Sequence, residues 1–252
     1  MEKLIIVPDV HGRTFWKDVM EYKDTPVVFL GDYLDPYPME NIGKQQAIDN
    51  FLEILDYAKQ NNNVTLLLGN HDMGYSIGTH ICDCRRDAKN YKTIQNLFLE
   101  NANMFTLAVD FEVGGKKFFI SHAGITQRWY EENKEVFGVD SYNDVLNANL
   151  INKLFFEGKL DGILGQVSLY RGGWNDCGSI VWADFREHIY VKPMDYNGTI
   201  QIVGHTMLIG NPVDVTRDYE VCCVDSQKCV YLDENGILEI LVTNNENDKR
   251  NT

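Results

Sequence analysis

The chain alternates short apolar runs with longer amphipathic stretches, which is the pattern of an α/β fold. Runs at 4–7, 27–30 and 64–68 predict strands buried on both faces, because they lack the polar alternation of a half-exposed strand. Between them, residues 13–22 and 43–60 carry apolar side chains at helical spacing. The chain therefore predicts a βαβ start that continues into a second helix and a third strand.

The middle of the chain gives further helix and hairpin signals. Residues 88–101 predict a helix, and residues 127–158 predict mostly helical structure. Segments 109–113 and 117–120 predict the two strands of a hairpin, because the Gly114-Gly115 pair between them suits a tight turn. The glycine-rich segment that follows residue 158 predicts loops.

Strand signals return near the end of the chain. An apolar run at 199–203 predicts one more strand. An antiparallel finish is predicted over 219–224, 228–232 and 237–242, with Asn235-Gly236 as one turn. With 44% hydrophobic residues in 252 and no Pro/Ser-rich linker, we expect one domain over 1–242. Residues 243–252 have no apolar pattern and predict a polar, frayed tail.

Charge and cysteine content restrict the classes of partner and compartment. A formal net charge of −14 argues against a nucleic-acid partner, because an acidic field repels a polyanion, whereas bound cations could neutralise part of this acidity. No apolar run reaches membrane-spanning length, and 4–7 is too short for a signal peptide, so no membrane partner is expected. Six cysteines without a CxxC pair or even spacing favour a reducing cytoplasm.

Possible metal ligands follow the predicted strands one after another. The set is Asp9, His11, Asp32, Asn70, His122 and His205. Each of these residues alone is more often a helix cap or a satisfied loop histidine. Five strand ends that all deliver such residues argue against coincidence, because the carboxyl ends of strands in α/β sheets gather at one edge.

The ligand types indicate the metals and the chemistry. Carboxylate, amide and imidazole ligands without a thiolate suit Mn, Fe or Zn. Two ions roughly 3.5–4 Å apart need a bridging carboxylate, and Asp32 has the central position for it. Two adjacent cations lower the pKa of a bridging water, so that a hydroxide becomes available for in-line attack on phosphorus.

Five short motifs, in this order, resemble the calcineurin-like metallophosphoesterase superfamily. They are Asp9-x-His11-Gly12, Gly31-Asp32-x-x-Asp35, Gly69-Asn70-His71-Asp72, His122-Ala123-Gly124 and Gly204-His205. The second and fourth forms are closest to the phosphoprotein phosphatase branch, which includes serine/threonine phosphatases and symmetrical diadenosine tetraphosphate hydrolases. The motifs cover the first half of the chain densely, whereas residues 125–203 match nothing that can be placed.

The resemblance implies an α/β (α+β) fold of four layers, two mixed sheets flanked by helices, with a dimetal site at the sheet edge. By analogy, one metal is held by Asp9, His11 and Asp32, and the other by Asp32, Asn70, His122 and His205. The resemblance further implies that His71 is the general acid and that Asp35 orients it. The alternative is that His71 only caps its loop through a backbone hydrogen bond.

Two departures from the resembled branch affect the substrate site. Asp35 is followed by Pro36, where the branch usually has an arginine that grips the phosphate, and Asp72 replaces a glutamate. Arg171 and Arg186 are the candidate replacements for the missing arginine. Arg85 and Arg86 are weaker candidates, because a charged pair in a polar stretch is usually solvated.

These observations favour a phosphomonoesterase that acts on a phosphoserine or phosphothreonine protein or on a small phosphorylated molecule. The enzymatic alternative is a dinucleoside polyphosphate hydrolase or a phosphodiesterase. Diesterases of the superfamily usually carry Gly-His-x-His at the last motif, whereas here Met207 replaces the second histidine. The alternative from another class is a catalytically silent metal-binding scaffold, which is disfavoured because such relatives typically lose ligands.

Overall fold

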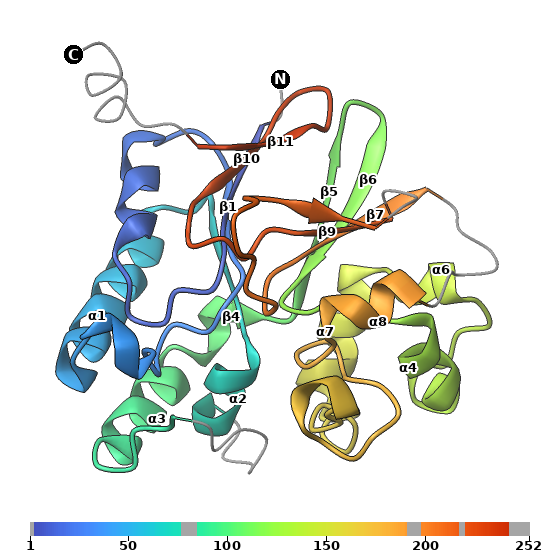
Figure 1. Cartoon of the computed structure of the whole chain (residues 1–252), viewed down its shortest axis with the longest axis horizontal. Helices are drawn as coiled ribbons and strands as arrows, with labels where there is room; N and C mark the ends of the chain where they lie inside the picture. The colour runs from blue at the N-terminus through green and yellow to red at the C-terminus, as the bar shows by residue number, and fades with distance from the viewer. Residues whose placement is uncertain (1–2, 77–84, 191–197, 217–219, 242–252) are drawn as a thin grey trace.

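Two mixed β-sheets pack face to face in the centre of the molecule (Figure 1). The computed structural model describes residues 3–76, 85–190, 198–216 and 220–241. The first sheet has the order β11-β10-β1-β2-β3-β4, with β1 (Leu4–Val7), β2 (Val27–Phe29), β3 (Val64–Leu67), β4 (Phe105–Thr106), β10 (Val230–Leu232) and β11 (Leu238–Ile240). The second has the order β5-β6-β7-β9-β8, with β5 (Ala108–Val113), β6 (Lys116–Ser121), β7 (Thr199–Val203), β8 (Asp214–Val215) and β9 (Val221–Cys223).

Parallel pairing brings the carboxyl ends of the central strands to one edge. In the first sheet, β1, β2 and β3 are parallel neighbours, with Ile6 opposite Val28 and Val28 opposite Thr65. In the second sheet, β6, β7 and β9 are parallel neighbours, with Ile120 opposite Ile202. The loops that follow these strands therefore meet at one place.

Alternate side chains of the buried strands serve two different cores. On β1, Leu4 and Ile6 pack between the two sheets, in the cluster that also contains Ile120 and Ile202. Ile5 belongs instead to the core beneath the helices. Because successive side chains of a strand point to opposite faces, a strand with a core on each face is apolar throughout. Burial on both faces of these strands therefore explains the continuous apolar runs in the sequence.

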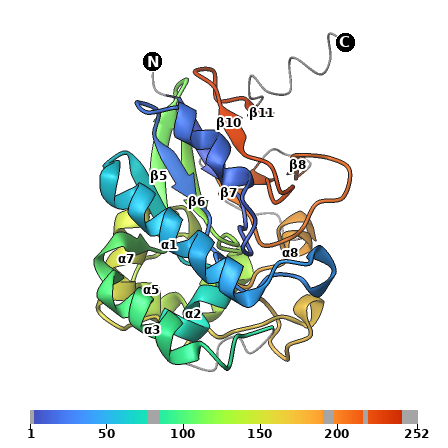
Figure 2. The same ribbon diagram turned by 90° about the vertical axis from the view of Figure 1, so that its left-hand side faces the viewer.

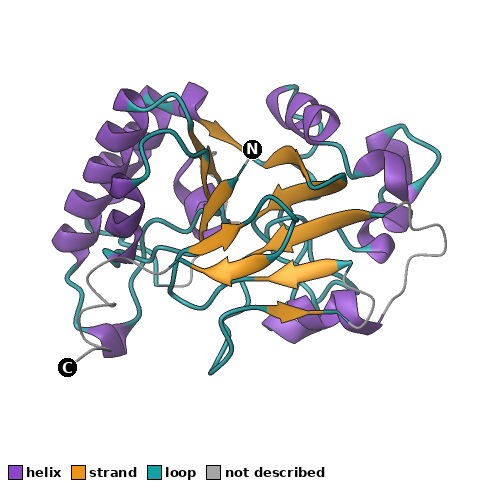
Figure 3. Ribbon diagram, turned by 90° about the horizontal axis from the view of Figure 1, so that it is seen from above, coloured by secondary structure: helices purple, strands orange, loops and turns teal. Residues whose placement is uncertain are grey.

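Helices stand on both sides of the paired sheets (Figures 2 and 3). Beside the first sheet lie α1 (Lys44–Gln60), α3 (Tyr91–Glu100) and the 3-10 helix η1 (Phe15–Glu21). Beside the second lie α4 (Gln127–Glu132), α5 (Lys134–Phe137), α6 (Tyr142–Val145), α7 (Ala148–Phe156) and α8 (Phe185–Tyr190). The short α2 (Asn70–Ser76) follows β3, and η2 (Pro38–Glu40), η3 (Ala102–Met104) and η4 (Leu169–Arg171) are single turns. The expected four-layer arrangement is confirmed.

Several local expectations differ from the structure. The predicted helix at 13–22 is the 3-10 helix η1, whose N-cap residue Thr14 makes no side-chain capping bond within the described chain. The C-terminal strands do not form one antiparallel unit, because β9 pairs parallel with β7 in the second sheet and only β10 and β11 form a hairpin. The sequence did not predict α2, α8, β4 or β8. The tail at 243–252 lies outside the described residues, and among those described no helix is long and apolar enough to cross a membrane.

Candidate metal centre and active site

Each predicted ligand lies in a loop or helix that directly follows a strand of the common edge. Asp9 and His11 follow β1, and Asp32 follows β2. Asn70 opens α2 immediately after β3. The second sheet contributes two histidines, His122 after β6 and His205 after β7. All six side chains are buried, so that the two sheets deliver them into one water-poor space.

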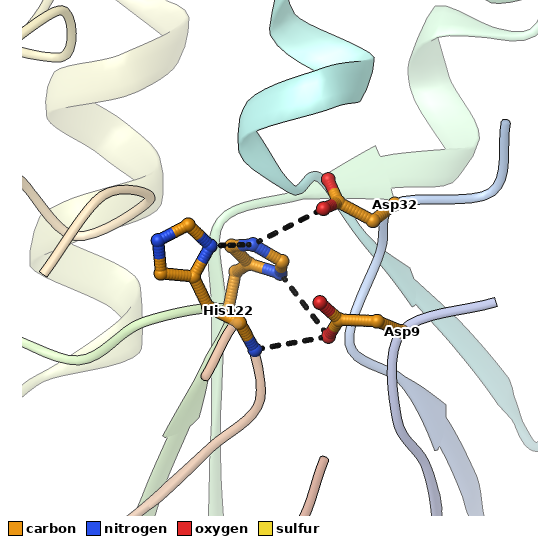
Figure 4. Close-up of side chains that lie close together, drawn as sticks. Asp9, Asp32 and His122 are labelled. Carbon is orange, nitrogen blue, oxygen red and sulfur yellow. Dashed lines mark hydrogen bonds and ion pairs between the residues drawn. The ribbon is translucent and has the colours of Figure 1, made fainter. Parts of the chain in front are cut away.

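The ligand atoms form two groups that share the carboxylate of Asp32. The first group contains Asp9, Asp32, His122 and His205, and the second contains His11, Asp32 and His71. Figure 4 shows Asp9, Asp32 and His122 pointing toward one another. Asp32 Oδ2 lies 3.5 Å from His11 Nε2 and 3.7 Å from His122 Nε2. Asp32 therefore has the central position that the sequence predicts for a bridging ligand.

Backbone carbonyls fix how two of the rings present their nitrogens. Nδ1 of His11 lies 2.9 Å from the carbonyl oxygen of Leu34, and Nδ1 of His122 lies 2.8 Å from that of Leu30. A carbonyl oxygen can only accept, so each Nδ1 carries the ring proton and donates it. Each Nε2 consequently keeps a lone pair that faces the cluster, as in metal-binding histidines whose other nitrogen is held by a carbonyl.

Two glycines allow the carboxylates to approach neighbouring backbone. A Cβ atom on Gly69 would lie 2.2 Å from Asp32 Oδ1, and one on Gly204 would lie 2.4 Å from Asp9 Oδ1. No side chain fits at either position without displacing a predicted ligand. Steric crowding by the carboxylates therefore explains why glycine occupies the first position of the Gly-Asn-His and Gly-His motifs.

Four site residues adopt left-handed backbone conformations, with φ of 46° at His11, 52° at Asp32, 60° at Asp35 and 62° at His205. Non-glycine residues rarely adopt positive φ, and such strain persists only where the surroundings enforce it. Here, backbone contacts such as the 3.0 Å hydrogen bond from His205 N–H to Asp9 Oδ1 hold the loops. The strained backbone conformations at these residues thus direct their side chains toward the ligand cluster.

Burial sets the protonation states of the cluster. It lowers the pKa of His11 to about 3 and that of His205 well below the usual value for histidine. Burial raises the pKa of Asp32, but attraction by the histidines around it outweighs burial and brings this pKa to about 2. At neutral pH the rings of His11 and His205 are uncharged and Asp32 is ionised, which are the forms that bind metal ions.

The donor set fits divalent cations. Burial, together with repulsion from Asp32, raises the pKa of Asp9, so the cluster is short of positive charge. Nε2 of His122 faces Nδ1 of His205 at 3.1 Å and Oδ1 of Asn70 at 3.1 Å. Nε2 of His205 is buried and has no hydrogen-bond partner within the described part of the chain. A cation would engage these lone pairs and compensate the carboxylates.

His71 and Asp35 lie together beside this cluster. Nδ1 of His71 is 3.0 Å from Asp35 Oδ2, while the other carboxylate oxygen accepts a 2.7 Å hydrogen bond from the hydroxyl of Tyr75. The backbone N–H of His71 also donates to Asp32 Oδ1 at 2.9 Å. The side-chain pair with Asp35 is therefore present, whereas the bond to Asp32 uses the backbone N–H of His71 and not its ring, and the role of His71 stays a prediction.

The four candidate arginines have different surroundings. Arg171 donates through Nη2 to the carbonyl oxygen of His205 at 2.9 Å and pairs through Nε with Asp184 at 2.8 Å. Arg186 also binds Asp184, and its side chain is 53% exposed. Arg85, ranked low from the sequence, has Nη2 at 3.2 Å from His71 Nε2.

Arg86, the neighbour of Arg85, has a different environment. Its guanidinium lies over the ring of Tyr91 on α3, at 5.1 Å from the ring centre. Among the predicted site residues, Arg171 contacts His205 and Arg85 contacts His71.

Asp225 is a buried carboxylate near the site that the sequence reasoning missed. It lies two residues beyond β9, and its Oδ1 has no hydrogen-bond partner among the described residues. Burial and repulsion from Asp9 raise its pKa well above the usual value. The signal was available in the sequence, because Asp225 follows an apolar strand in the same way as Asp9 and Asp32 do.

Comparison with known proteins places the chain in a family. The family model for calcineurin-like phosphoesterases matches residues 3–208, and no curated protein matches. A serine/threonine phosphatase from Saccharomyces cerevisiae with similarity to human phosphatase PP5 is 16% identical, with a TM-score of 0.46 over 94% of this chain and 79% of that one. A hypothetical protein from Pyrococcus horikoshii OT3 is 10% identical, with a TM-score of 0.45 over 99% and 92%. The phosphatase domain of the Legionella effector WipB is 16% identical, with a TM-score of 0.35 over 56% and 55%.

These structural similarities are too low to support an argument about activity, and the assignment rests on the family match. That match spans most of the chain and includes the residues of both ligand groups. The chain belongs to the calcineurin-like phosphoesterase family and is a hydrolase of phosphoric esters.

Proposed function

We propose that this protein is a dinuclear-metal-dependent phosphatase that hydrolyses phosphate monoesters. The observation that supports this proposal most strongly is the position of Asp32, whose carboxylate belongs to both groups of ligand atoms. A carboxylate shared by two sets of ligands is the arrangement that a two-metal phosphoesterase needs.

The residues present would hold two ions of Mn, Fe or Zn. By analogy with the family, Asp9, His11 and Asp32 would hold one ion, and Asp32 with Asn70, His122 and His205 would hold the other. The structure divides them differently, because the ligand atom of Asp9 lies with those of His122 and His205, and that of His11 lies with that of His71. When bound, such a pair of ions activates water for attack on phosphorus and stabilises negative charge on the phosphate oxygens.

His71 would transfer the proton to the leaving oxygen. Asp35 holds Nδ1 of the ring, and Tyr75 holds Asp35 in turn, so that Nε2 is the nitrogen available for proton transfer. An alkoxide is a poor leaving group unless it is protonated, and a positioned general acid typically contributes on the order of 10²–10⁴-fold. Asp35 acts through His71 and is a positioning residue.

Arg171 and Arg186 are the proposed substrate-binding residues. Arg171 has the stronger support, because its guanidinium lies against the backbone of His205. A guanidinium fork suits phosphate oxygens better than a single ammonium does. Alanine substitution of each arginine in turn, with kcat/KM as the readout, would show which of them binds substrate.

A monoester substrate is favoured by the residue at the end of the last motif. Met207 occupies the position at which diesterases of the superfamily usually have a second histidine. The substrate in this proposal is a phosphorylated protein or a small phosphorylated molecule in the cytoplasm. The four cysteines that the structure describes are free thiols, which suits a reducing compartment.

The test is a substrate panel with metal-reconstituted protein. Phosphoserine and phosphothreonine peptides, mononucleotides, dinucleoside polyphosphates and bis(p-nitrophenyl) phosphate would be compared, with metal-stripped protein as the control. We expect metal-dependent turnover of monoesters. Faster turnover of the diester or of dinucleoside polyphosphates would contradict the monoesterase proposal, and full metal binding with no turnover would support a silent scaffold.

A further inference from the structure

Arg85 reaches the His71 side of the site from a segment that contributes none of the phosphoesterase motifs. Its Nη2 atom lies 3.2 Å from His71 Nε2, and its Nε donates to the carbonyl oxygen of Asp35 at 3.0 Å. That carbonyl carbon is bonded to the nitrogen of Pro36. The guanidinium therefore lies next to the position from which the missing arginine of the motif would extend.

The surroundings of Arg85 hold the guanidinium in this place. It lies over the ring of Tyr37 with its central carbon 3.8 Å from the ring centre, a close cation–π contact. The ammonium of Lys44 donates to the backbone carbonyl of Arg85, whose φ is 58°. Arg85 is half-buried rather than a solvated surface charge. The sequence alone does not indicate this position, because all of these contacts are tertiary.

The contact between Arg85 and His71 also assigns the resting tautomer of the imidazole. An arginine nitrogen can only donate, so His71 Nε2 accepts and Nδ1 carries the proton toward Asp35. In this tautomer Nε2 carries no proton, and its lone pair is occupied by the hydrogen bond from Arg85, so it cannot protonate a leaving oxygen. A group with stronger acceptors must therefore engage Arg85 before His71 can act.

We propose that Arg85 is the phosphate-binding guanidinium that replaces the arginine absent after Asp35. Phosphate oxygens are stronger acceptors for a guanidinium than a neutral imidazole nitrogen is. A bound phosphoryl group takes the Nη2 donor of Arg85 and frees the lone pair of His71 Nε2, which then takes up a proton from solvent or from a protonated phosphate oxygen before passing it to the leaving oxygen. This inference rests on the proposed phosphatase function, and it assigns Arg171 and Arg85 to different parts of the site, beside His205 and beside His71.

The test measures phosphate binding separately from turnover. Metal-loaded wild type, Arg85→Ala, Arg85→Lys and the adjacent control Arg86→Ala are titrated with inorganic phosphate by calorimetry. Metal content, melting temperature and kcat/KM on p-nitrophenyl phosphate are measured on the same samples. We expect Arg85→Ala to bind phosphate about 10- to 100-fold more weakly with unchanged metal content, which is the scale of one charge-assisted hydrogen bond. Arg86→Ala should stay within about twofold of wild type, because its guanidinium packs on Tyr91.

Conservative variants separate binding from structure. Arg85→Lys keeps the charge without the fork and should recover only part of the affinity. Tyr37→Leu removes the ring beneath the guanidinium and should weaken phosphate binding, whereas Tyr37→Phe should not. If Arg85→Ala is poorly folded, the phosphate affinity of Arg85→Lys is compared with that of wild type instead. Equal affinity of these two proteins would overturn the assignment of Arg85 as the phosphate-binding residue.

The remaining outcomes distinguish this inference from the proposed function. Wild-type phosphate affinity in metal-loaded Arg85→Ala would overturn the inference, and so would loss of metal or a wild type that binds no phosphate. If wild type binds phosphate through Arg85 but turns over no ester, the phosphatase proposal fails while the binding role of Arg85 stands.

Discussion

The carboxylate of Asp72 accepts a hydrogen bond of 2.6 Å from the backbone N–H of Asp32. It also accepts from the N–H of Tyr33 at 3.1 Å and from that of Gly69 at 2.8 Å. One buried side chain on α2 thereby joins the loops that follow β2 and β3. These bonds hold Asp32 in its left-handed conformation, with its carboxylate directed into the ligand cluster.

Replacing Asp72 with asparagine should therefore destabilise the fold at the site. The amide has one acceptor oxygen, and its NH₂ group would face backbone donors. We expect a loss of about 2–4 kcal/mol in the free energy of unfolding, because the bonds are fully buried and the substitution leaves buried N–H groups without an acceptor. Thermal and urea denaturation measure the loss, with exposed Asp56→Asn on α1 as the matched control. Equal stability of the two variants would show that Asp72 is not needed to hold the loops.

Asp32→Asn should lose metal ions without losing the fold. The amide keeps the shape of the side chain and an oxygen for the N–H of His71, but it lacks the negative charge that two cations require. Elemental analysis should find fewer bound ions per chain, and activity should be abolished, while the melting temperature of the metal-free protein changes little. Full activity in this variant would refute the bridging role.

His71→Asn should show a dependence on the leaving group. Substrates with alkyl leaving groups should lose most of their turnover, on the order of 10²–10⁴-fold. The loss on p-nitrophenyl phosphate should be much smaller, because its leaving group needs little protonation. Metal content should stay unchanged. Equal losses on both substrates, or loss of metal, would instead indicate a ligand or structural role for His71.

His188 should make the stability of the fold depend on pH. The ring is buried on α8, with Nε2 3.0 Å from the carbonyl oxygen of Ala123, and burial lowers its pKa below 6.5. In the unfolded chain this pKa is about 6.5, so below that pH the unfolded state binds a proton that the folded state does not. Stability is therefore lost as the pH falls through about 6.5 toward the folded-state pKa.

The variant His188→Gln isolates this contribution from those of the other buried histidines. Between pH 7.5 and 5.5, the stability of wild type should fall by about 1 kcal/mol more than that of the variant. Urea denaturation of the metal-free proteins at both pH values measures the difference. Parallel pH dependence of the two proteins would mean that the pKa of His188 is the same in the folded and the unfolded state.

The strands and the residues that follow them could be predicted because local sequence determines them. The apolar runs before Asp9, Asp32 and His205 are short, buried on both faces and ended by loop residues, so their pattern does not depend on distant contacts. The same reasoning could have found Asp225, which follows β9 in the same way. Parallel pairing then converts a sequence order into a spatial cluster.

The remaining features depend on tertiary contacts that a single sequence does not express. The partner of β9 is decided by packing, because an apolar strand can add to either sheet. The segment that forms α2 begins with the ligand-type residues Asn70, His71 and Asp72 and contains Gly74, so its sequence has no clear helical pattern. Arg85 gains its position from the Tyr37 ring and the Asp35 carbonyl, about fifty residues earlier in the chain.

Titration of metal-stripped protein with Mn²⁺ tests the central claim most directly. Bound metal per chain and turnover of phenyl phosphate are measured at each addition. The shared position of Asp32 predicts that turnover is absent at first and reaches its maximum only when two ions are bound per chain. Undiminished turnover in the stripped protein, or maximal turnover with a single bound ion, would contradict a dinuclear phosphatase.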